Sequence, residues 1–126
     1  FRHTILRIYE HRCAVCGYDG KLGGSDLGLE AAHVQWHAAG GPDTEDNGLA
    51  LCVFHHRAFD RGALGLDARR RVLISQAIHG QTGVQDWLLR YAGAPLRAPQ
   101  RGATPPDERF IQWHRQEVFR GPPRAA

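Results

Sequence analysis

The chain has 126 residues, of which 42% are hydrophobic and 23% charged, and its formal net charge is +3. A chain of this size buries one modest core, which predicts a single domain. No apolar run approaches the roughly 20 residues of a membrane span, and the start does not resemble a signal peptide, so we expect no membrane partner. The chain begins at Phe1 rather than Met, and we expect a fragment of a longer protein.

Basic residues are unevenly distributed along the chain. Residues 61–126 hold 11 Arg against 5 acidic residues, whereas residues 1–60 hold 5 basic and 8 acidic residues. A basic half favours a polyanionic partner, although many Arg-rich surfaces have none. Three cysteines cannot all pair within one chain, and together with 8 histidines they favour metal binding in a reducing compartment.

The first half of the chain predicts a strand–loop–strand–helix order. Apolar spacing indicates helices, alternation indicates strands, and runs of Gly, Pro, Asp and Asn indicate loops. In order, we predict a helix over residues 1–12, a glycine-rich loop over 17–28, a strand over 29–36, a long irregular loop over 37–48, a strand over 49–51 and a helix over 52–60. Loops as long as the central one are usually functional.

The second half predicts flanking elements. These are a basic hairpin of residues 64–66 and 72–75, a helix over 84–91, a Pro-rich connector over 94–106 and a final helix over 107–119 with Asp107 near its start. Trp36, Trp87 and Trp113 are interpreted as core residues. His37 and His114 each adjoin a Trp and are interpreted as partly buried surface residues rather than DNA contacts.

Two short motifs predict a zinc site. Cys13 and Cys16 form a C-x2-C knuckle, and Cys52 and His55 lie three residues apart at the start of a helix, on one face of it. Together they make a Cys3His set that suits tetrahedral Zn²⁺ in a closed, structural site. The alternatives are buried thiols or a Cys13–Cys16 disulfide, and His56 or His11 could replace His55 as the fourth ligand.

The catalytic candidates are His33 on the first strand, Asn47 fourteen residues later, and His56 nine residues further on, on the helix. A single histidine is more often a packed or solvated residue than a catalyst. The combination stands beside a zinc knuckle in a strand–loop–strand–helix order, which chance seldom produces.

These residues resemble the HNH endonuclease family. The resemblance rests on the C-x2-C knuckle, AAHV at 31–34, NGLALC at 47–52 and the two histidines at 55–56. The segment LEAAHVQWHAAGGPDTEDNGLALCVFHHRAFDRG at 29–62 is similar to the C-terminal nuclease domain of McrA-like restriction enzymes, including phosphorothioated-DNA-binding ones. The similarity extends through WHRQEVF at 113–119.

The resemblance implies an α+β fold with a ββα-metal core at about 29–62. A helix and zinc knuckle would precede it over 1–28, and a basic hairpin and C-terminal helices would follow over 63–126. His33 then resembles the general base, Asn47 the residue that fixes the loop and orients the His33 ring, and His56 a ligand of a catalytic divalent ion (Mg²⁺, Mn²⁺, Ni²⁺ or Co²⁺).

Two positions depart from the commonest pattern of the family. Ala32 stands where many relatives have a second metal ligand, and Asp60 stands where many have a histidine. Asp60 faces the same way as His56 at i, i+4 and is a candidate ligand beside it; Glu30 is a further candidate. Arg57 and Arg61 could clamp DNA phosphates, or could equally form a solvent-exposed helix face.

The resemblance further implies hydrolysis of DNA to products with a 5′ phosphate and a 3′ hydroxyl. We expect the cleavage domain of a modification-dependent type IV restriction enzyme in the bacterial cytoplasm, lacking its N-terminal reader of modified DNA, and a homodimer is possible. The main rival is a non-catalytic zinc module that binds nucleic acid, which would need none of His33, Asn47 and His56. A toxin or homing nuclease would share the chemistry.

Overall fold

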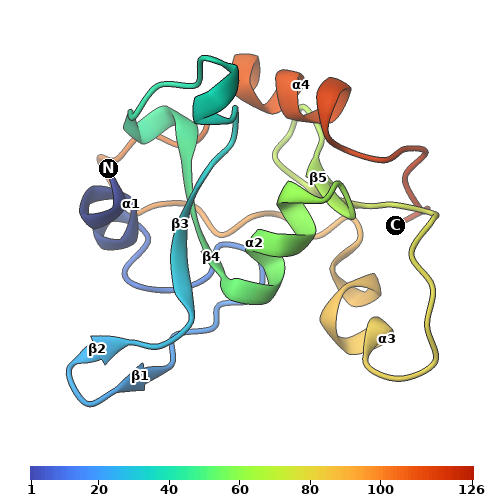
Figure 1. Ribbon diagram of the computed structural model, residues 1–126, viewed down its shortest axis with the longest axis horizontal. Coiled ribbons are helices and arrows are strands. Elements are labelled where there is room, and N and C mark those ends of the chain that lie inside the picture. Colours follow the sequence, from blue (N-terminus) through green and yellow to red (C-terminus); the bar gives the residue numbers. More distant parts are fainter.

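Two antiparallel strands and the helix that follows them form the centre of the computed structural model, which describes residues 1–126 (Figure 1). β3 (Leu29–His33) pairs with β4 (Gly48–Cys52), so that Leu29 lies opposite Cys52 and His33 lies opposite Gly48. α2 (Val53–Asp60) begins at the residue after β4 and packs against both strands. The predicted α+β class and ββα order are confirmed.

Cys52 makes the transition from strand to helix. Its backbone is extended, and its sulfur accepts a hydrogen bond from the backbone N–H of His55 at 3.4 Å, as an N-cap side chain does. The helix ends before Gly62, whose φ of +81° suits a residue without Cβ. α2 therefore has the bounds that the sequence predicts, except that Cys52 caps the helix rather than belonging to it.

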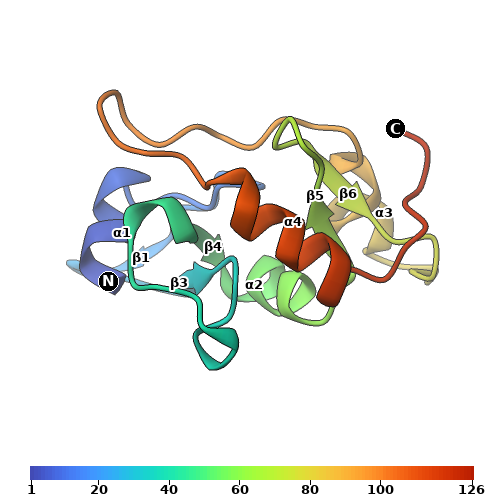
Figure 2. The same ribbon diagram turned by 90° about the horizontal axis from the view of Figure 1, so that it is seen from above.

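The remaining elements surround this core (Figures 1 and 2). They are α1 (Arg2–Ile8), β1 (Lys21–Leu22), β2 (Ser25–Asp26), the 3-10 turns η1 (His37–Ala39) and η2 (Glu45–Asn47), β5 (Leu64–Leu66), β6 (Val72–Ile74), α3 (Val84–Trp87), η3 (Leu89–Tyr91) and α4 (Glu108–Glu117). α1 packs on β3 and β4, and β5 packs between α2 and α4. Twenty-three buried hydrophobic residues form one continuous core.

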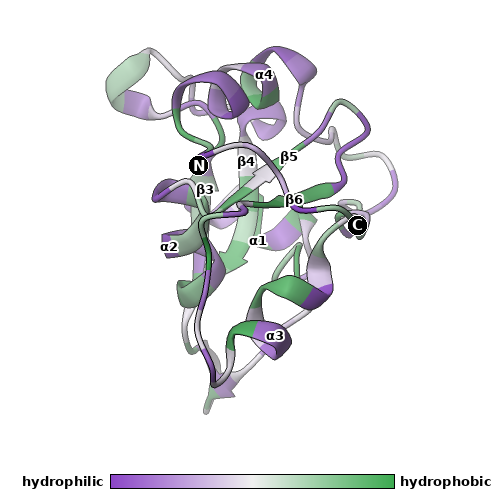
Figure 3. Ribbon diagram, turned by 90° about the vertical axis from the view of Figure 1, so that its right-hand side faces the viewer, coloured by the Kyte–Doolittle hydropathy of each residue, from purple (hydrophilic) through white to green (hydrophobic).

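Figure 3 shows β6 coloured as hydrophobic, whereas most of the α4 ribbon is coloured as hydrophilic. All five residues of β4 are buried, which explains why its sequence is continuously apolar rather than alternating. No helix combines the length and the hydrophobicity that crossing a membrane requires.

The last helix is attached through a buried histidine. The His114 ring stacks on Phe59 of α2 with ring centroids 3.7 Å apart, and its Nε2 donates to the Phe59 carbonyl at 2.8 Å. Burial lowers the pKa of His114 to about 4, so the ring is neutral at physiological pH. The interpretation of His114 as a surface residue is wrong, because its side chain joins two helices. Asp107 is the N-cap of this helix, as its sequence position indicates.

Several local predictions are corrected by the structure. The glycine-rich segment 17–28 contains the β1–β2 hairpin, and Gly23-Gly24 between the strands is the signal that points to such a turn. The strand expected over 29–36 ends at His33, and the helix expected over 84–91 is broken between α3 and η3.

The tryptophans also differ from the prediction. Trp36 is 38% exposed and Trp87 is 55% exposed, so neither is a core residue. Trp36 instead meets Trp113 edge to face at 5.7 Å, which places an aromatic pair at the surface.

A substitution at Gly48 can test the close packing of α1 on β4. A Cβ at this position would overlap the buried side chain of Ile5, whereas a Cβ at Gly24 would meet nothing within 4 Å. We expect Gly48→Ala to lower the free energy of unfolding by about 1–3 kcal/mol in urea denaturation, and Gly24→Ala to leave it nearly unchanged. Equal midpoints for the two variants would contradict this packing.

Candidate active site and metal centre

Three cysteines and one histidine meet beneath the start of α2. Cys13 and Cys16 come from the turn after α1, and Cys52 and His55 from the β4–α2 junction. Their four ligand atoms lie within 4.8 Å of one another, and His55 Nδ1 is 3.3 Å from the Cys52 sulfur and 3.8 Å from the Cys13 sulfur. All three cysteines are free. The structure thus brings together the four residues that the sequence singles out.

The contact made by Nε2 of His55 leaves Nδ1 as the ring atom that can bind a metal. Nε2 lies 2.7 Å from the carbonyl oxygen of Trp87. A carbonyl only accepts, so Nε2 carries a proton, and Nδ1 is the atom that faces the sulfurs and can bind a metal once its own proton is lost. A metal-bound histidine usually has such a partner on its second nitrogen.

The electrostatics of the cluster favour a thiolate. Hydrogen bonds from Cys16 and Cys52 lower the pKa of Cys13. Burial opposes a charge on His55, but hydrogen bonds to the cysteines and to the Trp87 carbonyl outweigh it and raise the pKa of His55 to about 10. The buried set therefore holds opposite charges without a metal, and a cation that binds here would displace protons.

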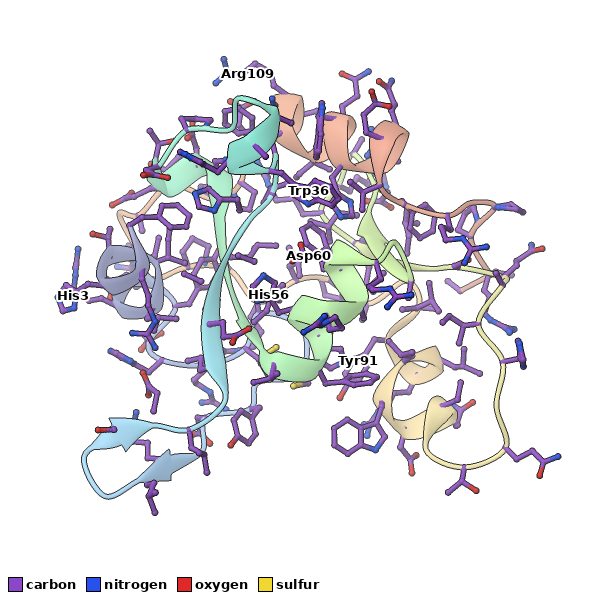
Figure 4. The ribbon with its side chains drawn as sticks, in the orientation of Figure 1. His3, Trp36, His56, Asp60, Tyr91 and Arg109 are labelled. Carbon is purple, nitrogen blue, oxygen red and sulfur yellow. The ribbon has the colours of Figure 1, made fainter.

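The two alternative fourth ligands lie elsewhere. His11 Nδ1 is 2.8 Å from an Asp26 oxygen, in contact with the β1–β2 hairpin. His56 is not part of the cysteine cluster and contacts the carboxylates of Glu30 and Asp60; Figure 4 shows it close to Asp60.

His56 lies between Glu30 and Asp60. Its Nδ1 is 2.6 Å from Glu30 Oε1 on β3, and its Nε2 is 3.1 Å from Asp60 Oδ2, one turn further along α2. The hydrogen bond to Asp60 raises the pKa of His56, burial opposes this, and the bond to Glu30 adds to the rise. The two carboxylates therefore occupy opposite nitrogens of one ring, and only one of them can share an ion with it.

This donor set fits a divalent cation at Nε2. Asp60 and Nε2 present one oxygen and one nitrogen side by side, and both side chains remain partly exposed. Glu30 then takes the Nδ1 proton and orients the ring, in the way that carboxylates support metal-bound histidines. Ala32 is fully buried and has no donor atom, so β3 offers no ligand at the position that the family pattern suggests.

His56 and Asp60 open into a cleft of about 490 Å³. Its walls include Glu30 and Trp36 on one side and the helix residues Arg57 and Arg61 on the other. Neither arginine forms a salt bridge in the structure. The cleft combines a candidate cation position with two uncommitted guanidinium groups, the groups that pair best with phosphate.

His33 is held at the end of β3 by contacts that the sequence does not reveal. Its ring stacks on Phe1 with centroids 4.1 Å apart and planes 7° apart, and its Nε2 is 2.7 Å from Asp43 Oδ1. The hydrogen bond from His33 lowers the pKa of Asp43, so this carboxyl group is ionised and can only accept. Nε2 therefore carries a proton, and the lone pair of neutral His33 is on Nδ1.

Asn47 fixes the loop between the two strands. The side chain is fully buried; its Oδ1 accepts from the Gln35 backbone N–H at 2.8 Å, and its Nδ2 donates to the carbonyls of Gln35 and Pro42 at 3.0 Å each. The amide forms no hydrogen bond with the His33 ring. Asn47 thus contacts the backbone on both sides of the loop, at Gln35, two residues after His33, and at Pro42, next to Asp43, and not the His33 ring itself.

The sequence comparison agrees with this geometry. Residues 13–67, from the first cysteine to the start of the basic hairpin, match the family described as HNH endonuclease. The matched segment holds the Cys3His cluster, His33, Asn47 and His56, and it is similar to HNH endonucleases. No curated protein matches the sequence.

Solved structures extend the likeness beyond the HNH motif. One of them, a modification-dependent TagI restriction endonuclease, superposes on this chain with a TM-score of 0.72 and 27% sequence identity. The match covers 93% of this chain and 36% of that chain, so this chain spans about a third of the restriction enzyme it resembles.

An isosteric substitution tests the role of Asn47. Asp at this position keeps an acceptor for the Gln35 N–H but places a carboxylate against two carbonyl oxygens, in a buried site. We expect Asn47→Asp to lower the free energy of unfolding by at least about 2 kcal/mol, because buried polar groups lose their partners. Urea denaturation measures this loss.

Gln112→Glu, an amide-to-acid change on the exposed side of α4, is the matched control. Limited proteolysis should also find the loop over residues 37–46 cut faster in Asn47→Asp than in the control. Unchanged stability and unchanged proteolysis would exclude the loop-fixing role.

Proposed function

We propose that this domain hydrolyses DNA phosphodiester bonds, with His33 as the general base and the His56–Asp60 pair as the ligands of a catalytic divalent ion. Two observations carry the proposal: a histidine with a fixed tautomer ends β3, and the His56–Asp60 donor pair opens into a cleft of about 490 Å³ that is also lined by Glu30 of the same strand. Glu30 and Trp36, which line the cleft, lie three residues before and three residues after His33 in the sequence.

His33 would take a proton from the attacking water. Asp43 holds the proton on Nε2, which leaves the Nδ1 lone pair as the acceptor, and stacking on Phe1 fixes the plane of the ring. After the transfer both nitrogens carry protons, and the ionised Asp43 stabilises the resulting imidazolium. Asp43 is thus a positioning residue that acts through His33.

His56 Nε2 and Asp60 would hold the ion, and Glu30 would keep the His56 ring oriented through Nδ1. A divalent ion bound there, Mg²⁺, Mn²⁺, Ni²⁺ or Co²⁺, would supply positive charge to stabilise the scissile phosphate and the leaving 3′ oxygen. Arg57 and Arg61 would bind non-bridging phosphate oxygens from the helix side of the cleft. The expected products carry a 5′ phosphate and a 3′ hydroxyl.

The Cys3His cluster would hold structural Zn²⁺. Its donor set fits this ion, because three thiol sulfurs and an imidazole nitrogen converge, and a backbone carbonyl fixes the imidazole tautomer. Four protein ligands leave no position for substrate. The zinc would instead attach the N-terminal turn to α2, the helix that carries His56.

We further propose that the domain is the cleavage module of a modification-dependent restriction enzyme of the bacterial cytoplasm. The support is the match to about a third of a restriction endonuclease of that kind. The remaining part of such an enzyme would include the reader of modified DNA, and residues 1–126 would form the single nuclease domain. Pairing of two chains, each cutting one strand, remains a prediction.

A zinc module that only binds nucleic acid is the weaker alternative. It would have no use for a base whose tautomer is fixed by a carboxylate, nor for two carboxylates around His56 in a cleft that binds a polyanion. Acidic groups repel phosphate unless a cation lies between them.

Nicking of supercoiled plasmid in Mn²⁺ or Mg²⁺ tests the catalytic assignment. We expect EDTA to stop the reaction and His33→Ala or His56→Ala to slow it by about 10²-fold or more, the usual contribution of a general base. Asp43→Asn should slow it less and shift the pH profile, because the ring loses the carboxylate that stabilises its charged form. His79→Ala, which removes an exposed histidine after β6, is the matched control.

Cutting by His33→Ala at the rate of the His79→Ala control would refute His33 as the base. Undiminished cutting by His56→Ala would refute the assigned ion position.

Metal analysis of the purified protein tests the structural site. We expect about one tightly held Zn²⁺ per chain, and Cys13→Ser should lose the metal and lower the thermal midpoint sharply, because binding free energy is folding free energy in such sites. His11→Ala removes the excluded alternative ligand and should keep its zinc. A stable, zinc-free Cys13→Ser protein with unchanged midpoint would refute the structural role.

A further inference from the structure

Three metal-binding side chains, among them the proposed base His33, meet outside the Cys3His cluster and the His56–Asp60 pair. His33 ends β3, His37 begins the η1 turn, and Asp43 lies in the following loop. One Asp43 oxygen is 2.7 Å from His33 Nε2 and 3.8 Å from His37 Nδ1, and the three ligand atoms all lie within 4.8 Å of one another. The His33 and His37 ring centroids are 5.9 Å apart.

The chemistry and the exposure of this trio suit a transition metal from solution. Two imidazole nitrogens and a carboxylate oxygen are ligands of zinc sites that keep an open fourth position. His37 is 76% exposed and Asp43 59% exposed, so both can adjust to a metal by small rotations. His33 is the least exposed of the three, at 24%, and Phe1 fixes its ring plane.

The loop that carries Asp43 is held in place independently of any metal. Asn47 binds the Pro42 carbonyl, and the Gly41 N–H donates to the Trp36 carbonyl at 2.9 Å. A Cβ at Gly41 would overlap the Gln35 carbonyl, so the chain turns as tightly as it can there. Asp43 is therefore presented to both rings by a fixed backbone, which lowers the cost of binding a metal.

We propose that His33, His37 and Asp43 form a second zinc site whose occupation switches the nuclease off. A metal on His33 Nε2 takes the position of the proton that Asp43 holds there, and the single proton of the neutral ring moves through solvent from Nε2 to Nδ1. Nδ1 can no longer accept a proton from water. The inhibitory consequence rests on the proposed function of His33 as the base, whereas the binding itself does not.

The binding is tested by equilibrium dialysis against Zn²⁺, comparing the wild-type chain with His37→Ala. We expect the wild type to hold one Zn²⁺ more per chain than His37→Ala, because the variant loses one of three ligands. His79→Ala removes an exposed histidine outside the trio and should bind as the wild type does. Equal zinc contents in the wild type and His37→Ala would overturn the site.

The switch is tested by plasmid nicking in Mg²⁺ with Zn²⁺ added at concentrations that fill the extra site. Without zinc, all three proteins should cut equally. With zinc, the wild type and His79→Ala should lose at least about 10-fold in rate, while His37→Ala keeps its rate. Equal inhibition of His37→Ala, as would follow from zinc entering the His56–Asp60 position, or faster cutting with zinc, would overturn the switch.

The two measurements separate this proposal from the proposed function. Extra zinc that binds to the wild type but not to His37→Ala, without any loss of cutting, would establish the site and refute His33 as the base. Loss of cutting together with that binding supports both.

Discussion

The antiparallel register of β3 and β4 is the constraint on which the candidate site depends. Because Leu29 lies opposite Cys52, β3 begins where α2 begins, and Glu30 comes within hydrogen-bonding distance of His56 on the first turns of that helix. Because His33 lies opposite Gly48, the β3–β4 pairing ends at these two residues. The connecting segment, which includes residues 37–46, leaves β3 and enters β4 there. A slip of one residue would turn every side chain of β3 to the other face and separate Glu30 from His56.

The β4–α2 junction contributes two of the four residues of the Cys3His cluster. Cys52 ends the strand, caps the helix and contributes a sulfur to the cluster, so its backbone conformation serves all three roles at once. The helix then places His55 toward the sulfurs and His56 toward the cleft, since consecutive residues on a helix point about 100° apart. The adjacent residues His55 and His56 therefore point from α2 toward two different sites.

The sequence predicts the parts of this arrangement that depend on short spacing. Cys13 with Cys16, Cys52 with His55, and His56 with Asp60 are each within one turn of chain, and local geometry brings each pair together. Asp43 could not be found in this way: its distance from His33 depends on the path of a ten-residue loop, which Asn47 and Gly41 determine. Stacking of Phe1 on His33 depends likewise on how α1 packs against the sheet.

A single physical rule connects the three functional histidines. Each has a ring nitrogen oriented by an acceptor: the Trp87 carbonyl for His55, Asp43 for His33, and Glu30 for His56, whose other nitrogen contacts the proposed metal ligand Asp60. That acceptor keeps a proton on the nitrogen it contacts and so leaves the other nitrogen for a metal or for a proton from water. The motif residues supply the imidazoles, but residues outside the motif decide which atom of each imidazole reacts. His33 differs from the other two because a second imidazole, that of His37, lies beside its acceptor, so it is the histidine whose reactive atom a bound cation can change.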